Sequence, residues 1–240
     1  MKVIFYPNRA IGHAINGIIS RAGWQIVFNL KEADAYVWWK FTSEYEKFPD
    51  ELIGKPCINS QCFSTLKGFV EQRFNNCYNE TTFVDPLTYK GEAVIKRFEN
   101  ATHECEIIKC PIDKKRVDVV YQRFLGDGKV IINNRVPVIF GEVPYVISQY
   151  KNHKFKGAFH GGVDYTEVKK PTDVFTKEWL DNLRKFCDGY IDYAELDVVD
   201  NCIVDVNNTA SMVTYFDLKE ADYCLNECAK LLINGYKTKK

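Results

Sequence analysis

The start of the chain shows a strand pattern, then a helix pattern, then strands again. Residues 3–6 form a short apolar run typical of a buried strand, and residues 25–28 and 35–39 repeat it. After the first run, apolar residues recur at the i, i+3, i+4 spacing of an amphipathic helix: Ile11, Ala14, Ile15, Ile18, Ile19 and Ala22. This order predicts a small parallel sheet at the start of the chain.

The middle of the chain is predicted to contain one helix and several strands. Asn59 or Ser60 can cap a helix that runs to residue 75, with an inner face of Phe63, Leu66, Phe69, Val70 and Phe74. Short apolar runs then predict strands at residues 92–97, 104–109, 117–125, 136–140 and 143–148. Residues 151–170 are basic, rich in glycine and low in periodicity, which predicts a loop.

The C-terminal part is predicted to contain two helices with a hairpin between them. Thr176 caps a helix that ends near residue 187, with a buried face of Trp179, Leu180, Leu183, Phe186 and Cys187. The last helix starts near Asp217 and Glu220, with a core face of Ala221, Cys224, Leu225, Cys228, Leu231 and Leu232. The whole order of elements predicts an α+β protein with a cleft between lobes.

The hairpin within residues 194–209 consists of two apolar strands joined by a polar turn. The two-residue period of a strand puts Asp205 and Asn207 on one face of the second strand. A three-residue loop at 200–202 would set Asp197 opposite Asp205, whereas a two-residue turn would put Asp197 on the other face.

Two carboxylates and an amide oxygen that converge among apolar strand residues repel each other and lose solvation. A hard cation such as Mg²⁺ removes that conflict, and Mg²⁺ usually brings the phosphates of a nucleotide with it. Asp197, Asp205 and Asn207 are therefore candidate metal ligands. The alternative is a surface hairpin that ends in polar residues.

Several cations are predicted to lie at strand ends, where they could face this acidic hairpin. Lys96 ends one apolar strand, Arg135 opens another, and Lys151 closes the strand after it. Three cations facing an acidic hairpin suit a complex of a metal with a triphosphate, although any one of these lysines could simply be solvated. His103 could orient a substrate, act as a base or bind phosphate, or it could be a structural histidine.

The apolar strand at residues 119–125 has polar residues in its middle. Such a strand can present backbone N–H and C=O groups to the edge of an adenine ring. The alternative is an amphipathic strand in which Gln122 faces water.

Composition narrows the class of protein. The 240 residues are 46% hydrophobic and 27% charged, with a formal charge of +0, which gives no support for a dedicated nucleic-acid or membrane-surface protein. No apolar run is long enough to span a bilayer, and residues 1–7 do not resemble a signal peptide. Nine cysteines without a C-x-x-C motif favour free thiols in a reducing cytosol, and hence a cytoplasmic location.

Cys224 and Cys228 lie one helical turn apart, which favours core packing of these two cysteines over a metal site.

Taken together, these motifs resemble those of the ATP-grasp superfamily. The family's acidic C-terminal signature looks like residues 196–199 and 204–209, and its phosphate lysine looks like Lys96 in the run Val94-Ile95-Lys96. Its earlier lysine is similar to Lys67, and its adenine hinge looks like residues 120–125. Its arginine strand and following basic residue are similar to Arg135 and Lys151.

The resemblance implies three α+β lobes, with ATP held between two antiparallel sheets. It divides the chain into a short N-terminal βαβ lobe (1–57), a small central lobe (58–121) and a C-terminal lobe with the metal-binding hairpin (122–240). It implies that a small-molecule or peptide carboxylate is activated as an acyl phosphate and then attacked by an amine or a thiol.

The resemblance also implies a role for each candidate residue. Mg²⁺ is expected on Asp197, Asp205 and Asn207, and catalysis is expected to involve Arg135, Lys151 and His103. ATP is expected to contact Lys67, Lys96, Gln122, Arg123, Phe124, Leu125 and Asp127.

Three features depart from the family pattern. The segment 97–104, where the family has a glycine-rich flap, contains no glycine, and Asp205 replaces the usual glutamate. The N-terminal lobe is also short, so the site for the acceptor substrate could be incomplete or shared with a partner. Two alternatives therefore stand beside a ligase: a nucleotide-binding protein without catalysis, and a scaffold domain that does not use ATP.

Overall fold

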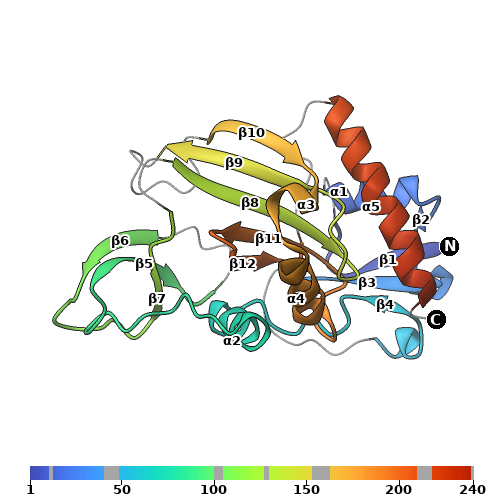
Figure 1. The fold of residues 1–240 in the computed structure, drawn as a ribbon. Coiled ribbons are helices and arrows are strands. Elements are labelled where there is room, and N and C mark those ends of the chain that lie inside the picture. The colour runs from blue at the N-terminus through green and yellow to red at the C-terminus, as the bar shows by residue number, and fades with distance from the viewer. Residues whose placement is uncertain are drawn as a thin grey trace.

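The structure is a computed structural model that describes residues 1–10, 13–40, 49–99, 105–126, 130–152, 163–209 and 218–238. Within these residues the strands form three sheets, which lie in different parts of the molecule (Figure 1). Helices and strands are mixed as an α+β fold, as the pattern predicts. The lobe boundaries at residues 57 and 121 stay a prediction.

The N-terminal part is a four-stranded parallel sheet in the order β2-β1-β3-β4. Its elements are β1 (Lys2–Pro7), α1 (Ala14–Arg21), β2 (Gln25–Ile26), η1 (Leu30–Glu32), β3 (Ala35–Trp39), η2 (Asp50–Leu52) and β4 (Cys57–Ile58). Strand β3 is buried along its whole length, because the sheet is covered on both faces. The predicted strand–helix–strand start and its parallel sheet are confirmed.

The small central sheet is antiparallel, in the order β6-β5-β7, and follows helix α2. Its elements are α2 (Lys67–Tyr78), β5 (Gly91–Arg97), β6 (Cys105–Cys110) and β7 (Val119–Arg123). Strand β5 lies in the middle, so Lys96 at its end is flanked by a strand on both sides.

The large sheet is also antiparallel, in the order β10-β9-β8-β11-β12. Its strands are β8 (Val130–Ile139), β9 (Val146–Asn152), β10 (Val163–Lys169), β11 (Tyr193–Val199) and β12 (Cys202–Asn207). The helices are α3 (Pro171–Val174), α4 (Lys177–Cys187) and α5 (Leu218–Thr238). Thr176 caps α4 as predicted, because its hydroxyl accepts a hydrogen bond from the Trp179 N–H at 3.2 Å. Residue 217, at the predicted start of the last helix, lies outside the described residues.

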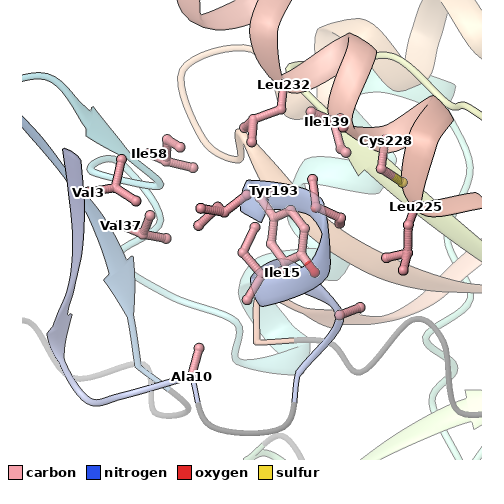
Figure 2. Close-up of a cluster of buried hydrophobic side chains, with 14 of the residues drawn as sticks. Val3, Ala10, Ile15, Val37, Ile58, Ile139, Tyr193, Leu225, Cys228 and Leu232 are labelled. Atoms are coloured by element: carbon pink, nitrogen blue, oxygen red, sulfur yellow. The ribbon is translucent and has the colours of Figure 1, made fainter. Parts of the chain in front are cut away.

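The large sheet has two different covers. One face packs against helices α2 and α4 through a cluster that includes Phe74, Trp179, Leu183, Phe186, Leu196, Val198 and Ile203. The other face is covered over part of its length by the N-terminal lobe and α5. Figure 2 shows Ile139 and Tyr193 of the large sheet meeting Ile15 of α1 and Leu225, Cys228 and Leu232 of α5.

The cysteines follow the predicted pattern. All nine lie within the described ranges and are free thiols. Cys224 and Cys228 are fully buried in the cluster between α5 and the sheets, which confirms the core-packing interpretation. None of the helices in the described part of the chain is both long and apolar enough to cross a bilayer.

The predicted helix over residues 59–75 is wrong in its first half, because α2 begins only at Lys67. Asn59 has a left-handed backbone with a φ of 63°. Its buried amide donates to the Tyr193 carbonyl at 2.8 Å and accepts from the backbone N–H of Asp192 at 2.9 Å. This contact, between residues more than 130 positions apart, ties Asn59 to β11, and the residues after it form turns in which Phe63 is exposed.

The predicted loop over residues 151–170 is also wrong in part. Strand β9 continues to Asn152, and Val163–Lys169 form strand β10, which pairs with β9 at the edge of the sheet. Residues 153–162 lie outside the described residues. Strand β10 has no fully buried residue, so its sequence lacks the apolar run by which a central strand is recognised.

The β11–β12 hairpin has a two-residue turn. Asp200 and Asn201 have φ values of 48° and 63°, a left-handed pair that suits the tightest hairpin turn and that Asp and Asn tolerate. Val199 pairs directly with Cys202 across this turn. The three-residue alternative for the loop is therefore wrong.

A bulge in β12 nevertheless brings the two carboxylates together. The register shifts between Asp197 and Val198, where Val204 is the extra residue, and Asp197 pairs with Asp205. One inserted residue moves every side chain beyond it to the other face of the sheet. Asp197 therefore lies opposite Asp205, as it would with a three-residue loop, but a bulge produces this arrangement. The expectation that a two-residue turn puts Asp197 on the other face is wrong.

Candidate functional site

Next to the part of the large sheet that packs against the N-terminal lobe and α5, the same face carries a group of charged side chains, with the acidic hairpin at its centre. Asp197 of β11 pairs with Asp205 of β12, and Asn207 lies two residues along β12 on the same face. Burial raises the pKa of Asp205, and the charge of Asp197 adds to this rise, while Lys67 and Lys96 oppose it. The hairpin therefore holds two carboxylates that repel each other in a poorly solvated place.

Two lysines of the central lobe lie next to Asp205. Lys67, at the start of α2, is buried, and its Nζ donates to the Glu99 carbonyl at 2.6 Å. Burial lowers the pKa of Lys96 at the end of β5, and the charge of Asp205 partly offsets this effect. Because the electrostatics couple each lysine to Asp205, the central and large sheets contribute to one charged group.

Two more cations approach from the large sheet itself. Burial lowers the pKa of Lys151 on β9. The negative charge of Asp197 raises this pKa in part, and the positive charge of Arg135 lowers it further. Arg135 on β8 lies opposite Asp197 across the strand pair, and its Nε is 3.0 Å from Asp197 Oδ1. Lys96, Arg135 and Lys151 are thus brought together with the acidic hairpin, as the sequence predicts. The expectation that Arg135 opens its strand is wrong, because β8 already begins at Val130 and Arg135 lies in its middle.

Glu195 is the member of this group that sequence reasoning did not select. Its Oε1 accepts a hydrogen bond from Arg135 Nη1 at 2.8 Å, and its side chain is only 4% exposed. Burial raises the pKa of Glu195 to about 7, an effect that Arg135 opposes and Asp197 reinforces. Its position two residues before Asp197, hence on the same face of β11, was the signal that could have found it.

The residues predicted to form the adenine hinge are engaged within the protein. Gln122 is 3% exposed, and its Nε2 donates to Thr82 Oγ1 at 3.0 Å, which excludes the alternative in which it faces water. Arg123 forms an ion pair with Glu80, and the N–H of Phe124 donates to the Glu92 carbonyl at 2.9 Å. Leu125 is partly buried against the cluster under the large sheet. What these four residues bind stays a prediction.

The hinge segment is attached to the hairpin turn. The N–H of Gly126 donates to Asp200 Oδ2 at 2.6 Å, and the guanidinium of Arg123 contacts Cys202 Sγ at 3.5 Å. The connection between the central and large sheets is therefore fixed at the end of the strands that carry Asp197 and Asp205. His103 and Asp127 lie outside the described residues.

The donor atoms at the hairpin fit a hard cation. Two carboxylates and the Asn207 amide give an all-oxygen set, and Asn207 Oδ1 accepts the N–H of Thr209 at 3.1 Å, which fixes its orientation. Within the described ranges, three or more His, Cys, Asp or Glu side chains are nowhere grouped as a metal site. A metal here would accordingly rely on the amide oxygen and on ligands from outside the protein, as Mg²⁺ commonly does.

Comparisons with known proteins reveal likeness in structure but not in sequence. No protein-family model and no curated protein matches the chain. The ATP-grasp ligase PsnB, complexed with a minimal precursor, Mg and ADP, is similar with a TM-score of 0.62 and 11% identity, covering 98% of this chain and 96% of that chain.

Two further solved structures agree. D-alanine–D-alanine ligase from Bacillus anthracis, complexed with ATP, has a TM-score of 0.59 and 14% identity, covering 99% of this chain and 97% of that chain. D-cycloserine synthetase DcsG has a TM-score of 0.55 and 8% identity, covering 98% of this chain and 100% of that chain. At such low identity these likenesses show the fold alone, which is ATP-grasp-like as the motifs predict.

Proposed function

From this ATP-grasp-like fold and its charged group, we propose that the protein is an ATP- and Mg²⁺-dependent ligase that joins a carboxylate to an amine or a thiol. One observation carries the proposal. Asp197 and Asp205 face each other on the large sheet, and their charges interact with those of Lys96 from the central sheet and Lys151 from β9. Opposed acidic and basic groups between two antiparallel sheets suit a metal–triphosphate.

Asp197, Asp205 and Asn207 would hold Mg²⁺ through their side-chain oxygens. When bound, the ion supplies positive charge to the phosphate oxygens of ATP, which stabilises the charge that develops during phosphoryl transfer. Binding would also remove the repulsion between the two carboxylates. The raised pKa of Asp205 supports this assignment, since it records an unfavourable charge that a cation would stabilise.

The protein's own cations would complete the neutralisation of the triphosphate. Lys67 and Lys96 would contact phosphates from the central lobe, and Arg135 and Lys151 from the large sheet. Phosphoryl transfer needs positioning and charge stabilisation more than a protein nucleophile, which agrees with a site of fixed charges. The backbone of residues 122–125 would hold adenine and Asp127 the ribose, while His103 would orient a substrate, act as a base or bind phosphate.

The reaction would proceed in two steps. An oxygen of the substrate carboxylate attacks the γ-phosphorus of ATP, the bond from that phosphorus to the bridging oxygen breaks, and ADP leaves with its electron pair. The amine or thiol then attacks the carbonyl carbon of the acyl phosphate, forming a C–N or C–S bond and giving up its proton. Phosphate leaves with the electrons of the broken C–O bond.

The substrates are proposed by analogy with the similar structures. One PsnB structure is complexed with a precursor peptide, and the other two names refer to D-alanine–D-alanine ligation and D-cycloserine synthesis. We extend this range to a small-molecule or peptide carboxylate and an amine or thiol acceptor for the present chain.

An ADP-release assay tests the proposal. Purified protein is incubated with ATP, Mg²⁺ and a panel of carboxylates paired with amines or thiols, beside the Asp205→Ala variant. We expect ADP release that requires both substrates and is about 10²–10³-fold slower in the variant, because a charge-stabilising centre is lost. ATP binding without ADP release across the panel would instead favour a nucleotide-binding protein without catalysis, the alternative that the glycine-free segment 97–104 supports.

A further inference from the structure

Arg135 of β8 lies between two acidic side chains that both belong to the neighbouring strand β11. Its Nη1 donates to Glu195 Oε1 at 2.8 Å, and its Nε is 3.0 Å from Asp197 Oδ1. All three side chains are largely buried, with exposed fractions of 17% for Arg135, 4% for Glu195 and 23% for Asp197. The guanidinium is therefore shared between Asp197, which is a candidate metal ligand, and Glu195, which is not.

Strand pairing explains how one arginine reaches both carboxylates. β8 and β11 are neighbours in the large sheet (Figure 1), and Arg135 lies directly opposite Asp197. Glu195 precedes Asp197 by two residues, so it lies on the same face about 7 Å further along β11. The long arginine side chain leans toward Glu195 while it stays within ion-pair distance of Asp197.

An arginine often binds a carboxylate with two parallel N–H···O contacts. This chain contains such a two-contact pair on its surface. Arg184 Nε and Nη2 donate to the two oxygens of Glu142 at 2.8 and 3.0 Å, while its Nη1 donates to Asp181 at 2.7 Å. Arg135 differs because Nη1 contacts Glu195 and Nε contacts Asp197, so that neither carboxylate is bound by two parallel contacts.

We propose that Glu195 is a positioning residue that holds Arg135 away from full pairing with Asp197, so that Asp197 keeps an oxygen for Mg²⁺. The proposal rests on the proposed function, since it assigns Asp197 to the metal. Without Glu195, the guanidinium would rotate onto Asp197 as Arg184 does on Glu142. Asp197 would then be neutralised, with both oxygens engaged.

The burial of Glu195 agrees with a role in positioning more than in stability. In the part of the chain that the structure describes, its second oxygen, Oε2, makes no hydrogen bond. Burying a carboxylate with one oxygen unsatisfied is unfavourable, and its attraction to one arginine rarely exceeds that desolvation. Besides Arg135, Asp197 receives a long contact of 3.5 Å from Asn133 Nδ2, so Arg135 is its nearer charged neighbour within the large sheet.

The first test needs no nucleotide. The side chain of Arg135 is located by crystallography in wild type, Glu195→Ala and Glu195→Gln. We expect both terminal contacts of Arg135 to move onto Asp197 in Glu195→Ala, and Arg135 to stay in place in Glu195→Gln, which keeps an acceptor oxygen and the volume. An unchanged Arg135 in a folded Glu195→Ala protein would overturn the proposal.

The second test measures the Mg²⁺ concentration at which a non-hydrolysable ATP analogue binds, by calorimetry. We expect the midpoint to rise about tenfold in Glu195→Ala, as is common when a neighbour of a metal ligand is removed, and less than threefold in Glu195→Gln. Binding of the analogue without Mg²⁺ should stay within about twofold of wild type. Glu142→Gln, which removes a carboxylate from the surface Arg184 pair, is the matched control and should leave the midpoint unchanged.

A double variant separates positioning from a direct effect. If Glu195 acts through Arg135, then Glu195→Ala combined with Arg135→Gln should have the same Mg²⁺ midpoint as Arg135→Gln alone. Additive losses, or an unchanged midpoint in Glu195→Ala, would overturn the proposal. If wild type binds no nucleotide at all, the proposed function fails and the Mg²⁺ role with it, while the crystallographic test still reports separately on whether Glu195 positions Arg135.

Discussion

The two faces of the large sheet use the same strands for different purposes. Along β11, Ala194, Leu196 and Val198 point to the face under α2 and α4, and each is fully buried among apolar side chains. The alternate residues Glu195 and Asp197 point to the other face, into the charged group. A period of two residues thus divides one strand between core and site.

The comparison shows that the charged group differs in its energetics from the apolar side chains that share its strands. Burial shifts the pKa of Asp205 and Glu195 upward and that of Lys96 and Lys151 downward, in each case toward the neutral form. For these four side chains, the attraction to opposite charges therefore does not offset the desolvation of the charged form. Such a face is unfavourable in the isolated protein and favourable once a ligand supplies the missing charge.

The largest expected effect lies on the apolar face. Leu196→Ala removes a fully buried side chain between β8 and β12, and we expect the free energy of unfolding to fall by about 3–5 kcal/mol. Urea denaturation measures it. Asp197→Asn, the neighbouring residue on the other face, is the matched control and should change stability by less than half as much. Equal losses of unfolding free energy in the two variants would contradict the difference between the two faces.

Glu195, on the charged face, should make the stability of the protein depend on pH. The pKa of Glu195 is raised to about 7 in the folded protein, above its unfolded value of about 4.3. Its contribution to stability is therefore fully present below about pH 4.3 and is lost as the pH rises through about 7, a change of about 3 kcal/mol. We expect wild type to lose this much relative to Glu195→Gln in urea denaturation from about pH 4 to about pH 8. Parallel pH profiles of the two proteins would contradict this expectation.

The smallest effect is expected at the turn that joins the two strands. Asn201 has a φ of 63°, a left-handed conformation that alanine adopts less readily. We expect Asn201→Ala to lower the free energy of unfolding by about 1 kcal/mol. The hydrogen bond that the Asn201 carbonyl accepts from Trp179 Nε1 at 2.8 Å should persist, because it involves the backbone. Replacement of the exposed Lys177 by alanine serves as a control that should have almost no effect. A loss of 3 kcal/mol or more would show that the turn has a larger role.

Much of the architecture could be predicted from the sequence, because local patterns determine it. The alternation along residues 194–209 predicts both strands of the hairpin and the shared face of Asp205 and Asn207. The length of the turn could not be predicted, because the bulge at Val204 depends on how β12 packs in the finished sheet.

The errors share one physical cause, which is that distant contacts override local pattern. Phe63 and Leu66 have helical spacing, but Asn59 ties that segment to the backbone at residues 192 and 193. Glu195 escaped selection because its importance comes from Arg135, sixty residues away on β8. Neither contact can be predicted from the spacing of residues that are near in sequence.

The most direct test of the central claim is thermal unfolding of wild type and Asp205→Ala, with and without a non-hydrolysable ATP analogue and Mg²⁺. A ligand that binds only the folded protein at ~100 times its dissociation constant adds about 2.7 kcal/mol, which appears as a clear rise in Tm. We predict a rise in wild type that requires Mg²⁺ and disappears in Asp205→Ala, while both proteins melt as folded domains without ligand. An unchanged Tm of wild type at millimolar nucleotide would contradict the proposed binding of ATP and Mg²⁺ and favour a scaffold that does not use ATP.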